Sequence, residues 1–187
     1  MKRALLVIDV QNDYFPGGAL PITHPPDSLY WITEAMDGAA MAAVPIVIIQ
    51  HGTDNPEAKS FLKGSRGWRL KGEVEVRKRA VVIEKTLPGS FTGTILDAWL
   101  KENGIDTLVI AGYMSQMCCD TTARQAVHLG YQVEFLSDAT GTLDFANQAG
   151  KVSAEELHRA TLVTQQFRFS KVLTTEAWIG SLNSVGK

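Results

Sequence analysis

Two adjacent cysteines, Cys118 and Cys119, are the residues best suited to do chemistry in this chain of 187 residues. They are its only cysteines, and they follow an apolar run that ends at Gly112. A segment with helical periodicity comes next, so the pair lies at the start of a helix, where backbone N–H groups favour an anion. A thiol at such a position tends toward thiolate. We therefore predict Cys118 as a nucleophile and Cys119, about a hundred degrees further around the helix, as a packing residue.

A carboxylate and an ammonium group end two other apolar runs. Asp9 follows residues 4–8, and Lys85 follows residues 81–84. Because ligand sites in open parallel sheets lie beyond the carboxyl ends of the strands, we expect Asp9, Lys85 and Cys118 to converge. Asp9 could then act as a general base, and Lys85 would lower the pKa of both neighbours. Each residue alone also fits an ordinary structural role, so the prediction depends on their convergence.

Several further residues lie next to predicted strand ends or in long loops and are candidates for the wall of a pocket. They are Tyr14, Phe15, His51, Trp68 and Tyr113. A pocket rich in aromatic side chains suits a flat or apolar acyl group. Packing in the core or against a neighbouring subunit would explain the aromatic residues equally well.

The elements that must position these residues are short apolar strands alternating with amphipathic helices. Strands are predicted at residues 4–10, 45–50, 80–84, 107–111, 131–136 and 171–174. One of the helices carries an apolar stripe formed by Leu157, Ala160, Val163 and Phe167, and Ser153 with Glu156 predicts a capping box at its start. The alternation predicts one α/β domain over residues 1–187, with a mostly parallel sheet and helices on both faces. Two long connections, 13–27 and 51–79, are candidates for a lid or a subunit interface.

Composition limits the classes of function. A net charge of -2 gives no indication of a nucleic-acid or membrane partner. The first apolar run is too short for a signal peptide, and two neighbouring cysteines are typical of reduced thiols in a cytoplasmic protein. The first predicted strand is followed by no Gly-x-Gly-x-x-Gly motif, which argues against a dinucleotide-binding dehydrogenase.

These residues, in this order, resemble the isochorismatase-like cysteine hydrolase superfamily, which includes nicotinamidases and N-carbamoylsarcosine amidase. The matching segments are residues 6–15, Lys85 with Ser90 and Phe91, residues 111–131, and residues 137–139. The resemblance implies a three-layer Rossmann-like fold with strand order 3-2-1-4-5-6 and a homodimer or homotetramer. It also implies a triad of Asp9, Lys85 and Cys118, a cis peptide bond between Tyr113 and Met114, and an oxyanion hole formed by the N–H groups of Met114 and Cys118.

The resemblance also indicates a reaction. Family members that hydrolyse isochorismate lack the cysteine, so Cys118 favours cleavage of a carbonyl C–N bond. Nicotinamidases bind a metal through an Asp-x-His pair, whereas residues 50–56 contain His51 and no such pair. His24, His128 and His158 are scattered, so we expect neither a metal nor another cofactor.

Our hypothesis is a metal-independent hydrolase that cleaves an amide or carbamoyl C–N bond of a small molecule through a thioester. An ester or thioester hydrolase with the same triad, and a non-catalytic binding or redox-responsive protein, remain alternatives. A nucleophilic thiol should have a depressed pKa, which would separate the enzyme from the non-catalytic protein.

Overall fold

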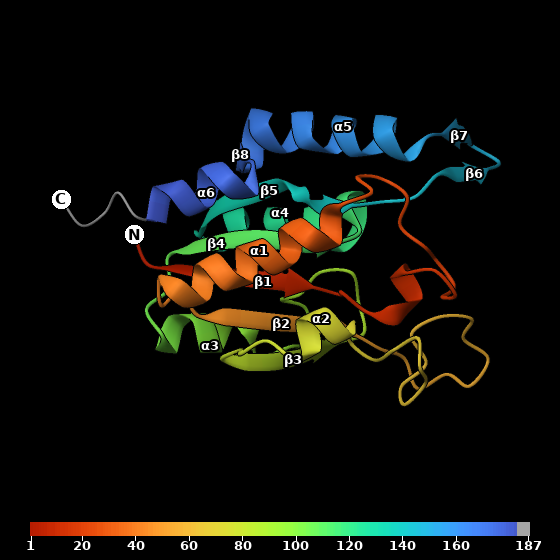
Figure 1. Ribbon diagram of the computed structural model, residues 1–187, viewed down its shortest axis with the longest axis horizontal. Helices are drawn as coiled ribbons and strands as arrows, with labels where there is room; N and C mark the ends of the chain where they lie inside the picture. Colours follow the sequence, from red (N-terminus) through yellow and green to blue (C-terminus); the bar gives the residue numbers. More distant parts are fainter. Residues whose placement is uncertain (183–187) are drawn as a thin grey trace.

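In the computed structural model, which describes residues 1–182, a sheet of six parallel strands has the order β3-β2-β1-β4-β5-β8 (Figure 1). The strands are Arg3–Ile8 (β1), Ile46–His51 (β2), Val81–Lys85 (β3), Thr107–Tyr113 (β4), Gln132–Gly141 (β5) and Lys171–Leu173 (β8). The predicted fold class is confirmed, because the strand predicted to be sixth, at residues 171–174, is β8. The two additional strands form a separate antiparallel hairpin.

Helices cover both faces of the sheet, since its central strands are apolar on both sides. The longer helices are Ser28–Met41 (α1), Leu96–Glu102 (α3), Asp120–His128 (α4), Ala154–Thr164 (α5) and Thr175–Leu182 (α6). One apolar cluster contains Ile32 of α1 and Trp178 of α6, and a second contains Leu96 of α3 and Ala123 of α4. Thus α1 and α6 pack on one face, and α3 and α4 pack on the other.

Strand β5 is longer than predicted because it contains an irregularity. The β4–β5 register shifts between Ile110, which pairs with Phe135, and Gly112, which pairs with Thr140. Beyond β5, the short strands Phe145–Asn147 (β6) and Gly150–Val152 (β7) form the hairpin at the right of Figure 1. The apolar pattern did not predict this hairpin, because its residues are largely exposed.

Helix α5 presents a different face to the protein from the one that its apolar stripe suggests. The predicted capping box is present, with Ser153 accepting a hydrogen bond from the Glu156 N–H. However, Val163 is 65% exposed and Phe167 is 86% exposed. The buried face is formed by Ala154, His158, Thr161 and, just after the helix, Gln165. Hydrogen bonds from His158 and Gln165 to other elements hold that face inward.

The two long connections lie against each other beyond the end of β1. Asp13 is in the 3-10 turn Asn12–Tyr14 (η1), and its buried carboxylate accepts hydrogen bonds from the N–H of Phe61 at 2.6 Å and of Ala19 at 3.3 Å. The second connection also contains the short helix Gly72–Glu75 (α2). These hydrogen bonds hold both loops at the edge of the sheet where the predicted site lies.

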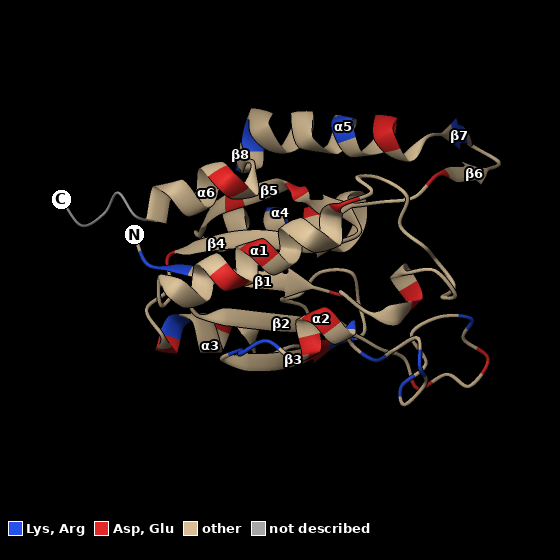
Figure 2. Ribbon diagram, viewed as in Figure 1, with Lys and Arg blue, Asp and Glu red and all other residues tan. Residues whose placement is uncertain are grey.

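Charged residues of both signs are spread over the helices and loops, whereas β2 carries none (Figure 2). Within residues 1–182, no helix combines the length and the apolar character that crossing a bilayer would require.

Candidate active site

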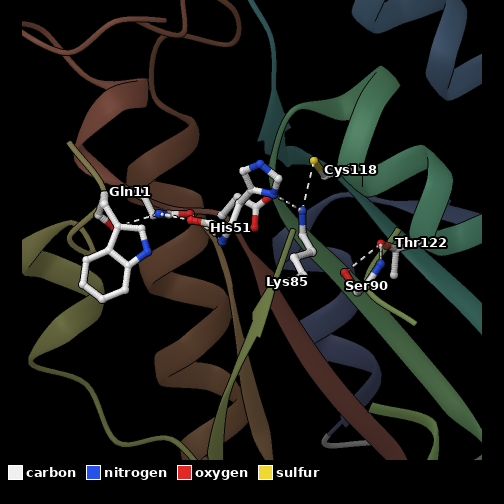
Figure 3. A network of polar contacts seen from close by, with 8 residues as sticks. Gln11, His51, Lys85, Ser90, Cys118 and Thr122 are labelled. Carbon is white, nitrogen blue, oxygen red and sulfur yellow. Dashed lines mark hydrogen bonds and ion pairs between the residues drawn. The ribbon is translucent and has the colours of Figure 1, made fainter. Parts of the chain in front are cut away.

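The ends of β1 and β3 and the turn after β4 bring three functional groups together. The Lys85 ammonium lies 2.7 Å from Oδ2 of Asp9 and donates a hydrogen bond to Sγ of Cys118 at 3.3 Å (Figure 3). The side chains of Asp9 and Lys85 are fully buried, whereas Cys118 is 6% exposed. The structure thus places the three residues of the predicted triad in one group, in which Cys118 is the least buried.

Asp9 reaches this position because the chain turns at the end of β1. It has a φ of 53°, which is uncommon for a residue other than glycine. Beside it, Gly112 pairs with Ile8 across the β1–β4 register and has a φ of 114°. A Cβ at Gly112 would overlap the backbone of Ile8. The glycine therefore lets the end of β4 lie close to the end of β1, so both strands deliver their functional groups to one place.

Lys85 is the last residue of β3, and the segment that follows it is hydrogen-bonded to helix α4. The Ser90 N–H donates to Oγ1 of Thr122 at 3.1 Å, and the two hydroxyl oxygens lie 2.8 Å apart (Figure 3). Both residues are fully buried, and Thr122 is on α4, which directly follows the cysteines. This contact fixes the exit of β3 relative to the element that carries the thiol.

Cys118 lies on a single π-helical turn, Ser115–Cys119 (η2), between β4 and α4. The peptide bond before this turn, between Tyr113 and Met114, is cis, at the position that the resemblance implied. The Met114 carbonyl accepts a hydrogen bond from the Cys119 N–H at 3.2 Å. Among residues 1–182, the Met114 N–H has no hydrogen-bond acceptor. This N–H group is therefore free to bind an oxyanion.

The pKa of the Cys118 thiol is raised, so the expectation of a depressed pKa is wrong. Burial is the largest cause, and the negative charge of Asp9 adds to it, while Lys85 acts in the opposite direction without overcoming them. Burial likewise raises the pKa of Cys119. In the free protein Cys118 is a thiol at neutral pH, so a thiolate has to form during the reaction. A titration of the free thiols therefore does not separate a nucleophile from a packing residue.

One oxygen of Asp9 is free to receive the thiol proton. Oδ2 forms the ion pair with Lys85, whereas Oδ1 is buried and has no hydrogen-bond partner among the described residues. Burial acts to lower the pKa of Lys85, but the charge of Asp9 and the interaction with Cys118 outweigh it and raise that pKa. Lys85 thus remains cationic at neutral pH between a carboxylate and a thiol, which is the arrangement that general-base activation requires.

His51, the last residue of β2, contacts Lys85 as well. Its Nδ1 lies 3.4 Å from the ammonium (Figure 3), and because an ammonium only donates, Nδ1 accepts and Nε2 carries the proton. Burial lowers the pKa of His51, and Lys85 lowers it further. Gln11 holds the His51 backbone, donating from Nε2 to its carbonyl at 2.8 Å and accepting from its N–H at 2.9 Å. His51 therefore enters the site as a neutral imidazole.

Tyr14, Phe15 and Tyr113, three of the aromatic residues predicted for the pocket, form one cluster. The Tyr113 ring lies 5.5 Å from that of Tyr14 and 5.8 Å from that of Phe15, centroid to centroid. Phe61 completes the cluster, with its ring 5.1 Å from Tyr14 and 5.4 Å from His51. Phe61 was not predicted as a site residue, because its position in a long polar loop gives no indication of the contact.

The predicted pocket residues differ in what they can offer a ligand. Burial and the negative charge of Asp9 raise the pKa of Tyr14, so its phenol stays protonated near the triad. The Tyr113 hydroxyl instead lies 2.9 Å from the Ser28 hydroxyl on α1, so it already has a partner. Trp68 supports the site through its backbone, since its carbonyl accepts a hydrogen bond from Gln11 at 2.7 Å.

Comparison with known proteins assigns the chain to a family. The isochorismatase domain model matches residues 3–177. The chain belongs to the isochorismatase family. A crystal structure of an isochorismatase homologue from Burkholderia xenovorans LB400 superposes with a TM-score of 0.94 at 46% identity, covering 97% of this chain and 87% of that one.

Two curated relatives extend the comparison. The isochorismatase family protein YddQ of Bacillus subtilis (strain 168) is 35% identical over 96% of this chain and 99% of its own length. Nicotinamidase 3 of Arabidopsis thaliana is 31% identical over 89% of this chain and 82% of its own length. The protein is therefore an isochorismatase-family hydrolase, and the triad lies within the matched domain.

One cavity of this isochorismatase-family protein lies away from the triad. It has a volume of about 510 Å³ and is lined by residues that include Gln132, Phe169 and Lys171. Gln132 and Lys171 begin β5 and β8, so this cavity lies at the amino edge of the sheet. The group around Cys118 lies at the opposite edge, where parallel sheets bind ligands.

Proposed function

We propose that this protein hydrolyses a C–N bond of a small amide or carbamoyl compound through a thioester on Cys118, without a metal ion. The observation that supports this most strongly is the Lys85 ammonium held between Asp9 and Cys118, at 2.7 Å and 3.3 Å. A buried cation between a base and a thiol offsets the cost of forming a thiolate in a site that otherwise disfavours it. The likeness to a nicotinamidase favours an amide as the substrate.

The first half of the reaction forms the acyl-enzyme. Asp9 takes the proton from Cys118, and the sulfur attacks the carbonyl carbon of the substrate. The carbonyl electrons move to the oxygen, and the N–H groups of Met114 and Cys118 bind the resulting oxyanion. The C–N bond then breaks, Asp9 gives its proton to the departing nitrogen, and a thioester and a free amine result.

The second half releases the acid. Asp9 takes a proton from water, and the hydroxyl attacks the thioester carbonyl to form a second tetrahedral oxyanion at the same N–H groups. Collapse breaks the C–S bond, and the sulfur recovers the proton from Asp9. The balance is one water consumed for each C–N bond broken.

The surroundings of the thiol favour a flat acyl group of low polarity. Tyr14, Phe15, His51 and Phe61 contribute rings near the triad, and His51 is neutral. Lys85 already has three partners, in Asp9, Cys118 and His51. A charged acyl group would thus lose hydration without gaining a free counter-ion among these residues.

The test is a screen of small amides and ureides, with the intact mass of the protein measured after rapid acid quenching. We expect one acyl adduct on Cys118 for a true substrate and release of the corresponding amine. Cys118→Ala should show neither, whereas Cys119→Ala, at a fully buried packing position, should retain the adduct. Each amide is paired with the ester of the same acid. An adduct from esters alone would replace the proposal with an esterase, and unimpaired amide turnover by Cys118→Ala would refute it.

A further inference from the structure

Helix α5 contacts η2, the turn that carries Cys118, through a buried histidine. His158 is 4% exposed and lies on the inward face of the helix. Its Nδ1 lies 2.7 Å from Oγ of Ser115, the first residue of η2, and its Nε2 lies 2.9 Å from the carbonyl oxygen of Ser137 in β5. One imidazole ring thus joins three elements that are distant in sequence.

The donors and acceptors in this contact can be assigned from chemistry. The Ser137 carbonyl only accepts, so Nε2 of His158 carries a proton and donates it. In the neutral ring Nδ1 is then an acceptor, and the Ser115 hydroxyl donates to it. Ser115 is fully buried, and within residues 1–182 the structure gives its hydroxyl no other partner. The pair is therefore satisfied in one protonation state, with His158 neutral.

Ser115 stands at the position where it can control the geometry of the site. It follows Met114, whose N–H is free, and it begins the turn that carries Cys118. The turn runs directly into α4, and the Met114 carbonyl accepts hydrogen bonds from the N–H groups of Met117 and Cys119. A side-chain bond from Ser115 to a helix outside the turn supplies an additional anchor.

We propose that His158 is a positioning residue, which through Ser115 holds the turn so that the N–H groups of Met114 and Cys118 face the developing oxyanion. This inference rests on the proposed function for its effect on catalysis, although the anchoring itself is independent of any substrate. His158 contacts Ser115 and Ser137, and it contacts neither Cys118 nor the atoms that react. Its effect is on the transition state, where the oxyanion forms, and much less on binding of the substrate.

The same contact predicts a pH dependence. A protonated His158 would carry a hydrogen on Nδ1, so the Ser115 hydroxyl would have to rotate and its own proton would lose its acceptor. The groups that face the ring are Ser115 from η2, the Ser137 carbonyl from β5 and His24, whose ring lies 5.5 Å away. Among the described residues, His24 is the one titratable group whose charge acts on His158, and it helps to keep the ring neutral. Activity should therefore have an acid limb to which His158 contributes.

The experiment compares His158→Phe, which removes both hydrogen bonds, with His158→Gln, whose amide can donate and accept but does not titrate. Ser115→Ala cuts the same link from the other end, and His128→Gln is the matched control, because His128 is exposed on α4. Hydrogen exchange followed by mass spectrometry measures the turn in peptides covering residues 111–119. The rate of alkylation by iodoacetamide measures the reactivity of the Cys118 thiol, and this reaction needs no oxyanion hole.

We expect His158→Phe and Ser115→Ala to accelerate exchange in residues 111–119 and to lower kcat by about 10- to 100-fold, with KM changed by less than about 3-fold. Alkylation of Cys118 should stay within about 3-fold of the native rate, because Asp9 and Lys85 are unchanged. His158→Gln should keep most of kcat at pH 7.5 and have a weaker acid limb than the native protein. His128→Gln should match the native protein in every measurement.

Unchanged exchange in the turn for both His158→Phe and Ser115→Ala would overturn the inference. So would a lowered melting temperature with unchanged kcat, because that result describes a purely structural residue. If the native protein hydrolyses none of the amides or esters, the proposed function fails, and the exchange measurement alone decides whether His158 anchors the turn.

Discussion

Replacing Asp9 by asparagine should move two reactivities of Cys118 in opposite directions. Hydrolysis should fall, because the base that takes the thiol proton and returns it to the leaving group is lost. Alkylation by iodoacetamide should rise, because the charge of Asp9 helps to raise the thiol pKa while Lys85 lowers it. With Asp9 neutralised, Lys85 at 3.3 Å acts on the thiol without that opposition.

The size of each effect follows from the geometry. Removing a neighbouring like charge from a buried group typically lowers its pKa by about 1–3 units. The thiolate fraction then grows about 10-fold per unit, while its nucleophilicity falls with a Brønsted coefficient of about 0.4–0.5, which leaves about 3- to 4-fold per unit. Alkylation should therefore accelerate by roughly 3- to 60-fold. Hydrolysis should slow by about 10²- to 10⁴-fold, the usual contribution of a general base.

Alkylation is measured between pH 6 and 9 by intact mass, with peptide mapping to assign the adduct to Cys118 instead of the fully buried Cys119. Because Asp9→Asn leaves the Lys85 ammonium buried without its carboxylate, the variant should lose about 3–5 kcal/mol of stability, and the assay is run well below its melting temperature. Asp37→Asn, at an exposed site on α1, is the control. Slower alkylation of Asp9→Asn than of the native protein would show that Asp9 does not raise the thiol pKa, and would refute this account of the site.

Three further predictions test the supports of the site. Gly112→Ala should be destabilised by at least about 1–3 kcal/mol in chemical denaturation, since its Cβ would overlap β1 and its φ is positive; a native midpoint would contradict the close approach of the two strands. Gln11→Leu should lower stability by about 1–3 kcal/mol and also raise KM, because three hydrogen bonds that hold His51 and Trp68 are lost, and unchanged KM would separate Gln11 from the pocket. Stability should fall as the pH drops below about 6.5, because the pKa values of His51 and His158 are lowered in the folded protein and the unfolded chain therefore binds protons first. Urea midpoints at pH 8 and pH 5.5 measure this fall, and His158→Gln should make it smaller.

The predicted convergence of Asp9, Lys85 and Cys118 depended on where apolar runs end and on the helix that starts after one of them. In a parallel sheet, the strand direction places every carboxyl end at one edge, so a residue's position in its run is enough to bring it there. The family resemblance then supplied the strand order. The structure agrees on both points because they are properties of the backbone, which short runs of Val, Ile and Leu specify well.

The pKa of Cys118 could not be obtained in the same way, and the sequence-based expectation had the wrong sign. Position at the start of a helix and the nearby Lys85 both argued for a lowered pKa. Burial and Asp9 oppose them, and the outcome depends on the depth of burial and on distances between three side chains. None of these quantities is encoded in spacing along the chain. The contact of Phe61 with His51 was missed for the same reason, since loop packing sets it.

Helix α5 shows how a correct periodicity can still predict the wrong face. An apolar stripe is usually assigned to the interior because burying it is favourable, by about 25 cal/mol per Å². In α5 a second row, at His158, Thr161 and Gln165, lies at helical spacing on another face and is buried instead. Each of these side chains finds a hydrogen-bond partner, including Ser115 at 2.7 Å for His158 and Asp120 at 2.7 Å for Gln165.

Choosing between two such faces requires knowledge of the opposing surface. A polar row can be buried only where complementary groups already stand, since an unmatched buried group costs about 1–3 kcal/mol. The surface opposite α5 carries Ser115 and Asp120 because it is formed by η2, which carries Cys118, and by the start of α4. The orientation of α5 thus follows from the polar groups of the candidate active site. This explains why a rule based on apolar periodicity fails at this helix, whereas in α1 the apolar residues Ile32 and Met36, four positions apart, are both buried.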